Sequence, residues 1–407
     1  MKLKVRLQLS TLMFLQYFVW GAWYVTITTY VTTTLHFKPI EAGLIFGTFS
    51  IAAMISPFFV GLVADKFFAT EKTLAVLHLL GAVILYLLSH VHSFGLFYAG
   101  LLIYSMCYAP TMALSNSLSF HQMEDPGKTF PGIRVLGTIG WIAAGMTIGF
   151  MKVESSVVQL YVAAIVSALL GLYCFTLPHV PPKKDTKVTF REIIGVDALQ
   201  LFRERAFAII IIASILTCIP LSFYYSWTNP FLNEIGMKFA ASKMTMGQMS
   251  EIFFMLVMPF FFIRMGVKRM IMIGMAAWLL RYLLFAFGNN ESLVWMLYTG
   301  IILHGVCYDF FFVTGQIFVD KQAPGHLKAS AQGMITFATY GLGMFIGTWF
   351  SGLIVGLFST TAAEVTTRDW REIWLIPMVI AVVVLILFAV LFKNPKKEVS
   401  ILKNSEF

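Results

Sequence analysis

Long uninterrupted runs of apolar residues limit the fold of this sequence more than any other feature. A helix of about 20 residues crosses the roughly 30 Å hydrocarbon core of a bilayer. A dozen runs reach that length, at residues 7–33, 42–64, 73–91, 94–118, 133–151, 157–177, 206–231, 246–264, 269–287, 292–315, 327–356 and 373–393. Unbroken runs exclude a transmembrane β-barrel, whose strands alternate apolar and polar residues. The sequence therefore predicts an all-α integral membrane protein with twelve transmembrane helices.

The composition supports a membrane protein. Hydrophobic residues make up 58% and charged residues 12% of the 407 residues, whereas about 25% are charged in a typical soluble domain. A soluble fold could not hide so much apolar surface. The first run follows Lys2, Lys4 and Arg6, as in a signal peptide. It is too long, too rich in Trp and Tyr, and lacks a small-residue cleavage site, so we interpret it as helix 1.

Lys and Arg placement predicts the orientation. With a cytoplasmic N-terminus, two of the 29 Lys and Arg residues lie inside predicted helices (Arg134 and Arg281), and 21 lie on the cytoplasmic side. The remaining six lie outside: Lys38, Lys152, Lys238, Lys243, Arg368 and Arg371. This bias follows the positive-inside rule and puts both termini in the cytoplasm. The net charge of +9 thus reflects topology and contact with anionic lipid, and it is no argument for nucleic acid.

A polar stretch divides the chain into two halves. We expect an N-terminal six-helix bundle over 1–177, a cytoplasmic linker over 178–205, a C-terminal bundle over 206–393 and a cytoplasmic tail over 394–407. Within the linker, residues 190–202 have the pattern of a short helix at the membrane surface. Short matches recur at offsets of 198 to 202, namely Pro57–Phe59 with Pro259–Phe261, Cys107-Tyr108 with Cys307-Tyr308, Pro126-Gly127 with Pro324-Gly325, and Gly145/Gly149 with Gly343/Gly347. They predict two parallel, pseudo-symmetric halves.

Ionisable and polar residues inside the apolar runs are the candidate functional residues, because burying them in lipid is costly. Of the 20 acidic residues, only Glu251 and Asp309 lie deep in predicted helices. Gln248 shares a helix face with Glu251 at i,i+3 spacing. Further polar and aromatic candidates are Arg134, Thr138 and Trp141 in helix 5, Gln16, Trp20 and Trp23 in helix 1, Ser222 and Tyr225 in helix 7, and His304 and Tyr308 in helix 10. Together they suit a solute with hydroxyl groups and a ring.

Most of these residues have a structural alternative. Arg134 could be a helix-end residue that reaches the interface, and the tryptophans could serve packing. His304 alone could be a hydrogen-bonded core histidine. We interpret Arg281 as structural or as a partner for a helix-packing acid, and His78 as a packing residue. Gln248, Glu251 and Asp309 are harder to explain by structure alone, because polar groups at this depth need partners.

The motifs that are missing limit the function classes. A carrier of phosphates or dicarboxylates would need clustered Arg and Lys at the midplane, so a neutral or weakly cationic solute is favoured. The sequence has no P-loop, dinucleotide fingerprint, zinc-protease or hydrolase motif. We therefore expect neither an enzyme nor a bound cofactor or metal. The four cysteines fall inside helices, where we expect free thiols.

Several motifs resemble the bacterial nucleoside:proton symporter family of the major facilitator superfamily across essentially the whole chain. They are Phe14–Trp23, Gly61–Lys66, Ile133–Gly140, Gln248–Glu251, Tyr308–Phe311 and Ala329–Gly333. Pro220–Tyr225 and Met244–Gln248 look closest to an uncharacterised branch of that family. The resemblance implies a substrate pocket between the halves, alternating access and coupling to the proton gradient.

By position, the resemblance also implies roles for individual residues. Arg134, Thr138, Gln248 and Glu251 would contact the nucleoside, Tyr308 and Trp141 would pack against it, and Asp309 matches an acid needed for transport. This chain departs from the family pattern at Ser222 and Tyr225, where Gln and Asn are usual, and at Trp141, His304 and Tyr308. These departures bear on the base that is selected. The three phenylalanines after Asp309 favour its neutral form, so we expect Asp309, ahead of Glu251, to carry the coupled proton.

Proton-driven nucleoside uptake at the bacterial inner membrane, by a monomer, is thus the leading hypothesis. A first alternative is uptake of another neutral ribosyl or polyol solute by the same mechanism. A second is a non-transporting membrane receptor or assembly factor. Buried acids without a large soluble domain favour transport over the receptor.

Overall fold

The computed structural model describes residues 1–59, 68–182, 196–362 and 365–394. The chain divides into two compact units. Unit 1 contains Met1–Ile193 and Lys238–Thr245, and unit 2 contains Ile194–Met237 and Met246–Phe407. The short segment Lys238–Thr245 therefore joins unit 1 although it lies beyond the linker in sequence.

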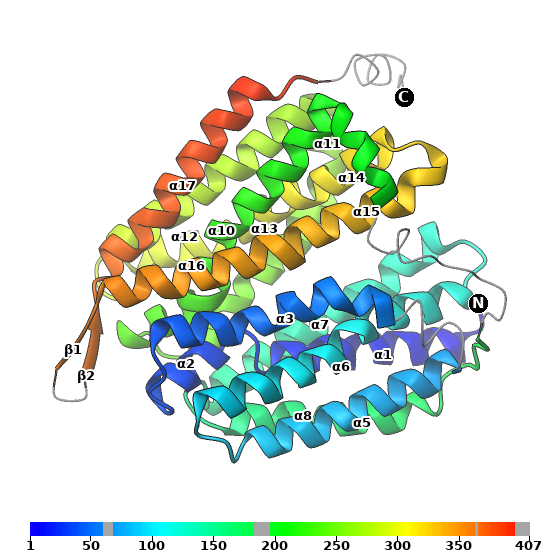
Figure 1. The fold of residues 1–407 in the computed structure, drawn as a ribbon, viewed down its shortest axis with the longest axis horizontal. Helices are drawn as coiled ribbons and strands as arrows, with labels where there is room; N and C mark the ends of the chain where they lie inside the picture. Colours follow the sequence, from blue (N-terminus) through cyan, green and yellow to red (C-terminus); the bar gives the residue numbers. More distant parts are fainter. Residues whose placement is uncertain (60–67, 183–195, 363–364, 395–407) are drawn as a thin grey trace. The chain divides into compact units, whose positions relative to one another are not determined.

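Unit 1 is built from helices that run side by side (Figure 1). These are α1 (Leu3–Gly21), α2 (Ile27–Thr33), α3 (Pro39–Phe59), α5 (Thr70–Leu88), α6 (Phe94–His121), α7 (Pro126–Met151) and α8 (Val158–Cys174). Helix α1 packs against α7, α5 against α8 and α6, and α3 against α6. The stretch Gly61–Lys66, one of the family-like motifs, lies outside the described residues.

The first transmembrane segment is broken, whereas the sequence predicted one helix over 7–33. Helix α1 ends at Gly21 and α2 begins at Ile27, with turns between them. Residues 25–29 are all β-branched, which lowers helix propensity at this point. Gly21 also brings α1 close to α7, because a Cβ atom there would lie 3.2 Å from the Cα of Trp141. The break therefore arises where weak propensity coincides with a close helix contact.

Unit 2 contains α10 (Arg205–Glu234), α11 (Ala240–Phe287), α12 (Val294–Ile302), α13 (His304–Tyr308), α14 (Thr314–Gln322), α15 (Lys328–Thr336), α16 (Met344–Leu357) and α17 (Trp370–Leu391). The first residues of α11, up to Thr245, belong to unit 1. Helix α11 holds both spans predicted at 246–264 and 269–287. The chain turns between them at Gly266, whose φ of 68° and ψ of 173° suit a residue without a side chain.

Two helices of unit 2 contain π-helical turns. Segment η3 (Asp309–Val313) lies between α13 and α14, and segment η5 (Phe337–Gly343) lies between α15 and α16. A π turn inserts one extra residue and redirects the side chains that follow, and such turns occur frequently at functional sites. Sequence periodicity did not predict either turn.

Nine helices among the described residues are long and apolar enough to cross a membrane. Because α11 holds two spans, and α8 and the broken α1–α2 pair are the remaining apolar segments, the described helices account for the twelve predicted crossings. The chain is therefore a multi-pass membrane protein. Most helix ends differ from the prediction by a few residues, as when helix 5 begins at Pro126 instead of 133.

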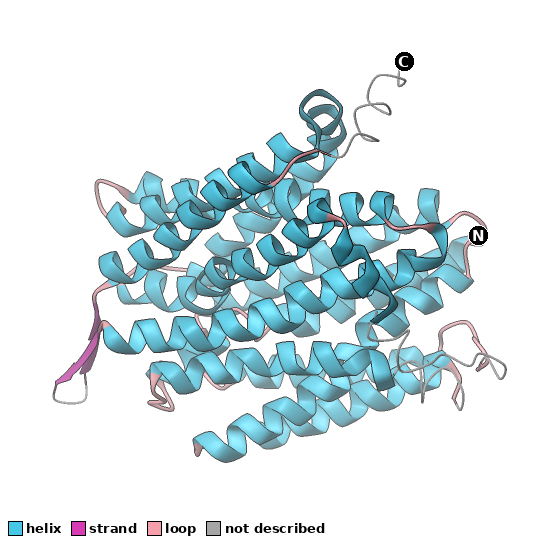
Figure 2. Cartoon of the chain, turned by 45° about the horizontal axis from the view of Figure 1, so that its top comes forward, coloured by secondary structure: helices cyan, strands magenta, loops and turns pink. Residues whose placement is uncertain are grey.

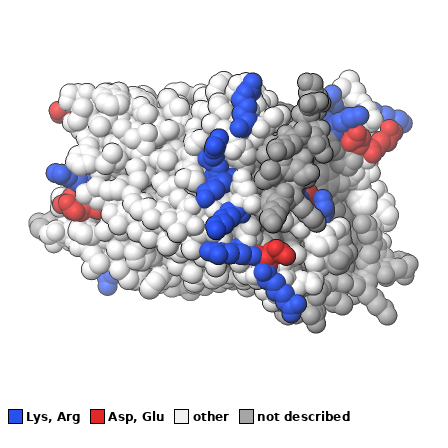
Figure 3. Space-filling view, turned by 90° about the horizontal axis from the view of Figure 1, so that it is seen from above, with Lys and Arg blue, Asp and Glu red and all other residues white. Residues whose placement is uncertain are grey.

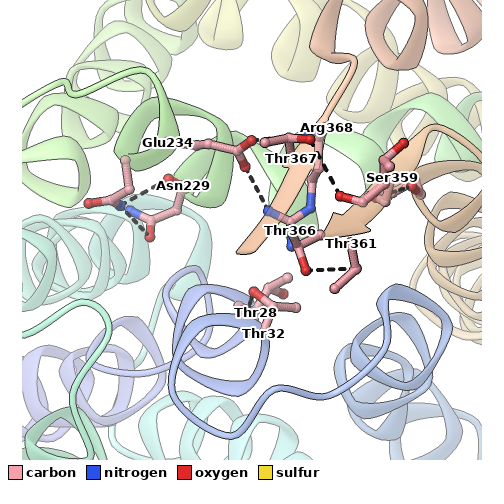
Figure 4. Close-up of polar contacts among 12 residues, drawn as sticks. Thr28, Thr32, Asn229, Glu234, Ser359, Thr361, Thr366, Thr367 and Arg368 are labelled. Carbon is pink, nitrogen blue, oxygen red and sulfur yellow. Dashed lines mark hydrogen bonds and ion pairs between the residues drawn. The ribbon is translucent and has the colours of Figure 1, made fainter. Parts of the chain in front are cut away.

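A small β-hairpin follows α16 and is the only strand pair within the described ranges (Figure 2), so the all-α prediction missed it. Strands β1 (Ser359–Ala362) and β2 (Val365–Arg368) pair antiparallel, Ser359 opposite Arg368. Arg368 Nη1 lies 2.6 Å from Oε2 of Glu234 on α10 and holds the hairpin base (Figure 4). Thr360, Thr361, Thr366 and Thr367 form two facing pairs, and such β-branched residues favour strands.

Charged side chains are unevenly distributed over the surface. On the face shown in Figure 3, Lys and Arg gather in a band, and the surface beside that band is almost uncharged. An uncharged zone of this kind is compatible with contact with lipid. Of the surface helix expected at residues 190–202, residues 190–195 lie outside the described residues, and residues 196–202 lie within a 3₁₀-helix, Val196–Arg203.

Candidate functional site

Unit 2 brings Glu251, His304 and Tyr225 together from three helices. The Nε2 atom of His304 lies 4.0 Å from Oε2 of Glu251 and 3.3 Å from the hydroxyl of Tyr225. The His304 side chain is fully buried, while 19% of the Glu251 side chain is exposed. One imidazole nitrogen thus faces both an acid and a phenol, and the acid remains accessible to a solute.

Aromatic rings surround this cluster. The Tyr224 ring stacks on His304 at 5.0 Å between centroids, with 18° between the planes, and the Tyr308 ring lies at 5.8 Å. The Tyr308 hydroxyl is hydrogen-bonded to the hydroxyl of Tyr340, in η5. Such rings offer flat faces for a heterocycle, and the phenols add hydrogen-bonding groups at the ring edge.

Gln248 lies on α11 one turn before Glu251 and is 8% exposed. The i,i+3 spacing puts both side chains on the same side of the helix, as the sequence predicted. Next to Gln248, a Cβ atom on Gly247 would lie 3.1 Å from Cβ of His304. Gly247 therefore allows α11 to approach the helix that carries His304.

Asp309 is completely buried at the start of η3. Neither of its carboxyl oxygens has a hydrogen-bond partner among the described residues. Phe310 packs in an apolar cluster with Met258 and Met270, and Phe311 and Phe312 are buried as well. A buried carboxylate without a partner carries a large desolvation penalty, so these surroundings favour a carboxyl group that holds its proton.

Ser222 is a candidate that the structure does not bring into this cluster. Its side chain is fully buried and donates a hydrogen bond to the carbonyl of Cys218 at 2.8 Å. A Cβ atom on Gly347 would come within 2.4 Å of the Ser222 hydroxyl oxygen. Ser222 therefore lies in the packing contact between α10 and α16.

In unit 1, three of the candidates, Arg134, Thr138 and Trp141, lie on one side of α7. All three side chains are partly exposed. The Arg134 guanidinium lies 4.1 Å from the centre of the Tyr17 ring, within cation–π distance. Trp141 meets Trp20 edge to face at 5.0 Å. Arg134 lies two turns inside α7, so it is not a helix-end residue.

A buried polar network in unit 1 connects Gln16, a candidate from the sequence, to residues that the sequence did not suggest. Gln16 donates to the Thr111 hydroxyl at 2.6 Å, and its carbonyl oxygen Oε1 lies 2.9 Å from Nε2 of His78. The hydroxyl of Tyr108 donates to the backbone carbonyl of Gln16. His78, interpreted as a packing residue, is thus a hydrogen-bonding partner of helix α1. A polar residue in each of three apolar runs was the only available signal.

Arg281 and Tyr340 also lie at the site and were not predicted as site residues. Arg281 is fully buried; its Nε donates to the carbonyl of Gly300 at 2.9 Å, and its guanidinium lies 4.1 Å from the Tyr224 ring centre. Its two terminal nitrogens have no hydrogen-bond partner within the described parts of the chain. The Arg281 guanidinium thus lies next to the Tyr224 ring, which stacks on His304.

Over the described ranges, no three His, Cys, Asp or Glu side chains are placed to hold a metal ion. The groups that the structure brings together here are hydrogen-bonding side chains, aromatic rings and carboxyl groups. These groups can bind a polar ring compound and exchange protons.

The comparisons with known proteins are consistent over the full length. A family model described as nucleoside H+ symporter matches residues 1–397. The protein YegT of Escherichia coli (strain K12) is 38% identical, over 98% of this chain and 97% of its own. The xanthosine permease of the same organism is 32% identical, over 97% of this chain and 98% of its own.

A solved structure matches as well. The nucleoside permease NupG of Escherichia coli (strain K12) is 34% identical over 96% of both chains. A crystal structure of a NupG variant superposes with a TM-score of 0.90 and covers 96% of this chain and 100% of its own. The predicted fold, two pseudo-symmetric six-helix bundles of the major facilitator type, is confirmed by this match.

Proposed function

Because the chain belongs to the nucleoside H+ symporter family, we propose that it takes up nucleosides together with protons by alternating access. The observation that best supports this proposal is the accessible Glu251 carboxylate, which lies beside His304 and Tyr225 in otherwise apolar transmembrane helices. A carboxylate at this depth has a large desolvation cost, so an interaction must offset that cost. Hydrogen bonds from a solute with several hydroxyl groups would do so.

In the proposed binding mode, polar side chains bind the ribose and aromatic side chains contact the base. Glu251 accepts hydrogen bonds from the ribose hydroxyls, since a carboxylate can accept from two neighbouring hydroxyls at once, and the Gln248 amide can both donate to them and accept from them. Tyr308 and Tyr225 face the base with their rings and hydroxyls. From unit 1, Arg134, Thr138 and Trp141 are proposed as further substrate contacts because they form one partly exposed side of α7.

Asp309 is the proposed proton carrier. It is buried, lacks a hydrogen-bond partner in the described part of the chain, and directly follows Tyr308 of the proposed binding site. A carboxyl group in this setting gains a proton readily and loses it only when water or a polar partner reaches it. Proton and solute movement are coupled if water reaches Asp309 to a different extent in the solute-loaded and empty states. Glu251 is the rival carrier, because it also lies in the membrane.

The orientation and environment are part of the proposal. We propose a monomer in the bacterial inner membrane with both termini in the cytoplasm, since 21 of the 29 Lys and Arg residues then lie on the cytoplasmic side. Anionic lipid headgroups would contact these residues.

Uptake into proteoliposomes tests the proposal. Purified protein is reconstituted, and accumulation of labelled uridine, adenosine and xanthosine is followed with an imposed inward proton gradient, without one, and with a protonophore. We expect concentrative uptake only with the gradient. Ribose and the polyol ribitol serve as competitors. If a free sugar or polyol accumulates and no nucleoside is transported, the substrate is a polyol or ribosyl solute instead of a nucleoside. Ligand binding without movement of any solute would favour the receptor alternative.

A further inference from the structure

Arg281 is a buried charge in unit 2 that the proposed binding mode does not use. It lies on α11, and its side chain is fully buried. Its Nε atom donates to the carbonyl of Gly300 at 2.9 Å, whereas Nη1 and Nη2 have no hydrogen-bond partner in the described part of the chain. A guanidinium keeps its charge at every accessible pH, so loss of a proton cannot relieve the cost of burying it.

Aromatic rings surround the guanidinium. Its Cζ atom lies 4.1 Å from the centre of the Tyr224 ring and 4.7 Å from the centre of the Trp278 ring. Cation–π contacts offset only part of the cost of removing an ion from water. An apolar side chain of similar size would avoid that cost, so a nearby group that requires the charge is the better explanation.

Two stacked rings lie between Arg281 and Glu251. The Tyr224 ring stacks on His304 at 5.0 Å between centroids, and Nε2 of His304 lies 4.0 Å from Oε2 of Glu251. The charges of Arg281 and Glu251 both act on Tyr224, and the charge of Arg281 also acts on His304. Such effects reach further here than in water, because the interior has a low effective dielectric constant. A cation and a carboxylate therefore act on the same aromatic stack.

Most other titratable groups around this stack are phenols and a thiol, which lose their protons only well above neutral pH. They are Tyr225 on α10, Tyr282 on α11, Cys307 and Tyr308 on α13, and Tyr340 in η5. The carboxyl group of Asp309 follows Tyr308 directly. Among the described residues around the stack, the groups that can exchange a proton near neutral pH are therefore His304, Glu251 and Asp309.

We propose that Arg281 is a positioning residue that keeps His304 neutral and Glu251 ionised, so that Glu251 stays a charged acceptor for the hydroxyl groups of the solute. This inference rests on the proposed function, in which Glu251 binds the ribose. A positive charge disfavours the uptake of a proton by either member of the pair. A protonated imidazole 4.0 Å from Glu251 would pair with the carboxylate and compete with the solute for its oxygens. The coupled proton is then left to Asp309.

The pH dependence of nucleoside binding tests this role. Calorimetry on purified protein measures the binding of uridine and adenosine, whose bases do not titrate in this range, from about pH 5 to about pH 8. A unit charge about 10 Å away, at an effective dielectric constant of about 20, changes a proton-binding equilibrium roughly tenfold. Without the charge, the pair takes up its proton at a higher pH. Arg281→Gln should therefore bind as wild type does at the alkaline end and roughly tenfold more weakly toward the acidic end.

Two further variants separate the charge from the packing. Arg281→Lys keeps the charge and should keep the wild-type pH dependence. Tyr282→Phe is the matched control, because it removes a hydroxyl that donates to the carbonyl of Pro220 from the next residue of α11 and changes no charge. It should also keep the wild-type pH dependence, and circular dichroism checks that each variant is folded. An equal loss at every pH in Arg281→Gln, an unchanged profile, or the same shift in Arg281→Lys would each overturn the inference.

A second measurement leaves Arg281 in place and applies even if the neutral variant does not fold. His304→Gln removes the imidazole. If His304 is neutral in the wild type, this variant keeps the wild-type pH dependence, whatever its affinity. Binding that extends to lower pH in His304→Gln would show that the imidazole takes up a proton beside Arg281, and the inference would be wrong. A wild-type protein that binds no nucleoside at any pH would contradict the proposed function itself.

Discussion

Glu71 joins the third transmembrane segment to the start of the linker through His179. The Oε1 atom of Glu71 lies 2.7 Å from Nδ1 of His179, and Oε2 accepts the backbone N–H of Val180 at 3.1 Å. The backbone N–H of Thr70 donates to the carbonyl of Val180 at 3.1 Å. Glu71 is only 5% exposed, whereas the His179 side chain is 65% exposed. The linker is therefore anchored to unit 1 where it leaves α8.

Glu71→Ala should weaken this anchor. The substitution leaves the N–H of Val180 and the ring of His179 without their acceptor, which costs about 1–3 kcal/mol in folding free energy. Unfolding by denaturant in detergent micelles measures it. Glu124→Ala, which removes an exposed acid of the same unit, is the control and should change stability by less than about 0.5 kcal/mol. Equal stability of the two variants would show that the anchor contributes nothing.

Gln16 should be essential to the stability of unit 1. Gln16→Leu keeps the side-chain volume but leaves the Thr111 hydroxyl and His78 without their partner, at a cost of about 1–3 kcal/mol. Gln122→Leu, just after the end of α6, is the matched control. The same denaturant titration applies. If Gln16→Leu is as stable as wild type, water or another side chain replaces the lost contacts.

Helix α10 should affect selectivity through Tyr225 and stability through Ser222. Tyr225→Asn removes the hydroxyl beside His304, so the order in which nucleosides compete for uptake should change. Ser222→Gln adds atoms where Gly347 already approaches closely, so about 1–3 kcal/mol of stability should be lost. Competition assays and unfolding curves on both variants separate the effects. A changed competition order in Ser222→Gln at wild-type stability would place Ser222 in the binding site instead.

Asp309→Asn should separate nucleoside binding from uptake against a concentration gradient. The amide mimics the protonated carboxyl, so nucleoside binding and exchange should persist while uptake against a gradient is lost. One coupled proton supplies about 2.3 kcal/mol per 100 mV, enough for roughly fortyfold accumulation of a neutral solute. Vesicle uptake with an imposed gradient measures the loss.

Glu251→Gln is the comparison for this experiment. It should weaken binding, because the proposed role of Glu251 is to hold the ribose. Concentrative uptake that survives in Asp309→Asn and disappears in Glu251→Gln, with binding intact in both, would assign the proton to Glu251.

The membrane class and the helix count could be read from the sequence because both depend on local composition. A run of about 20 apolar residues is sufficient to cross the bilayer wherever it occurs in the chain. The acids Glu251 and Asp309 were recognisable for the same reason, since a carboxyl group inside such a run is conspicuous without knowledge of its neighbours. The sequence pattern also indicated the repeat that relates Tyr108 to Tyr308.

Only the tertiary structure decided which side of each helix faces which neighbour. A helix that is apolar all around has no amphipathic stripe to indicate its rotation, so Ser222 and Tyr225 looked equivalent although one packs against α16 and the other contacts His304. The break after Gly21 depends in part on the close approach of α1 to α7, and the periodicity of the sequence indicated neither π turn. The same is true of the Tyr308–Tyr340 pair, because a hydrogen bond between two helices has no counterpart in the periodicity of either one.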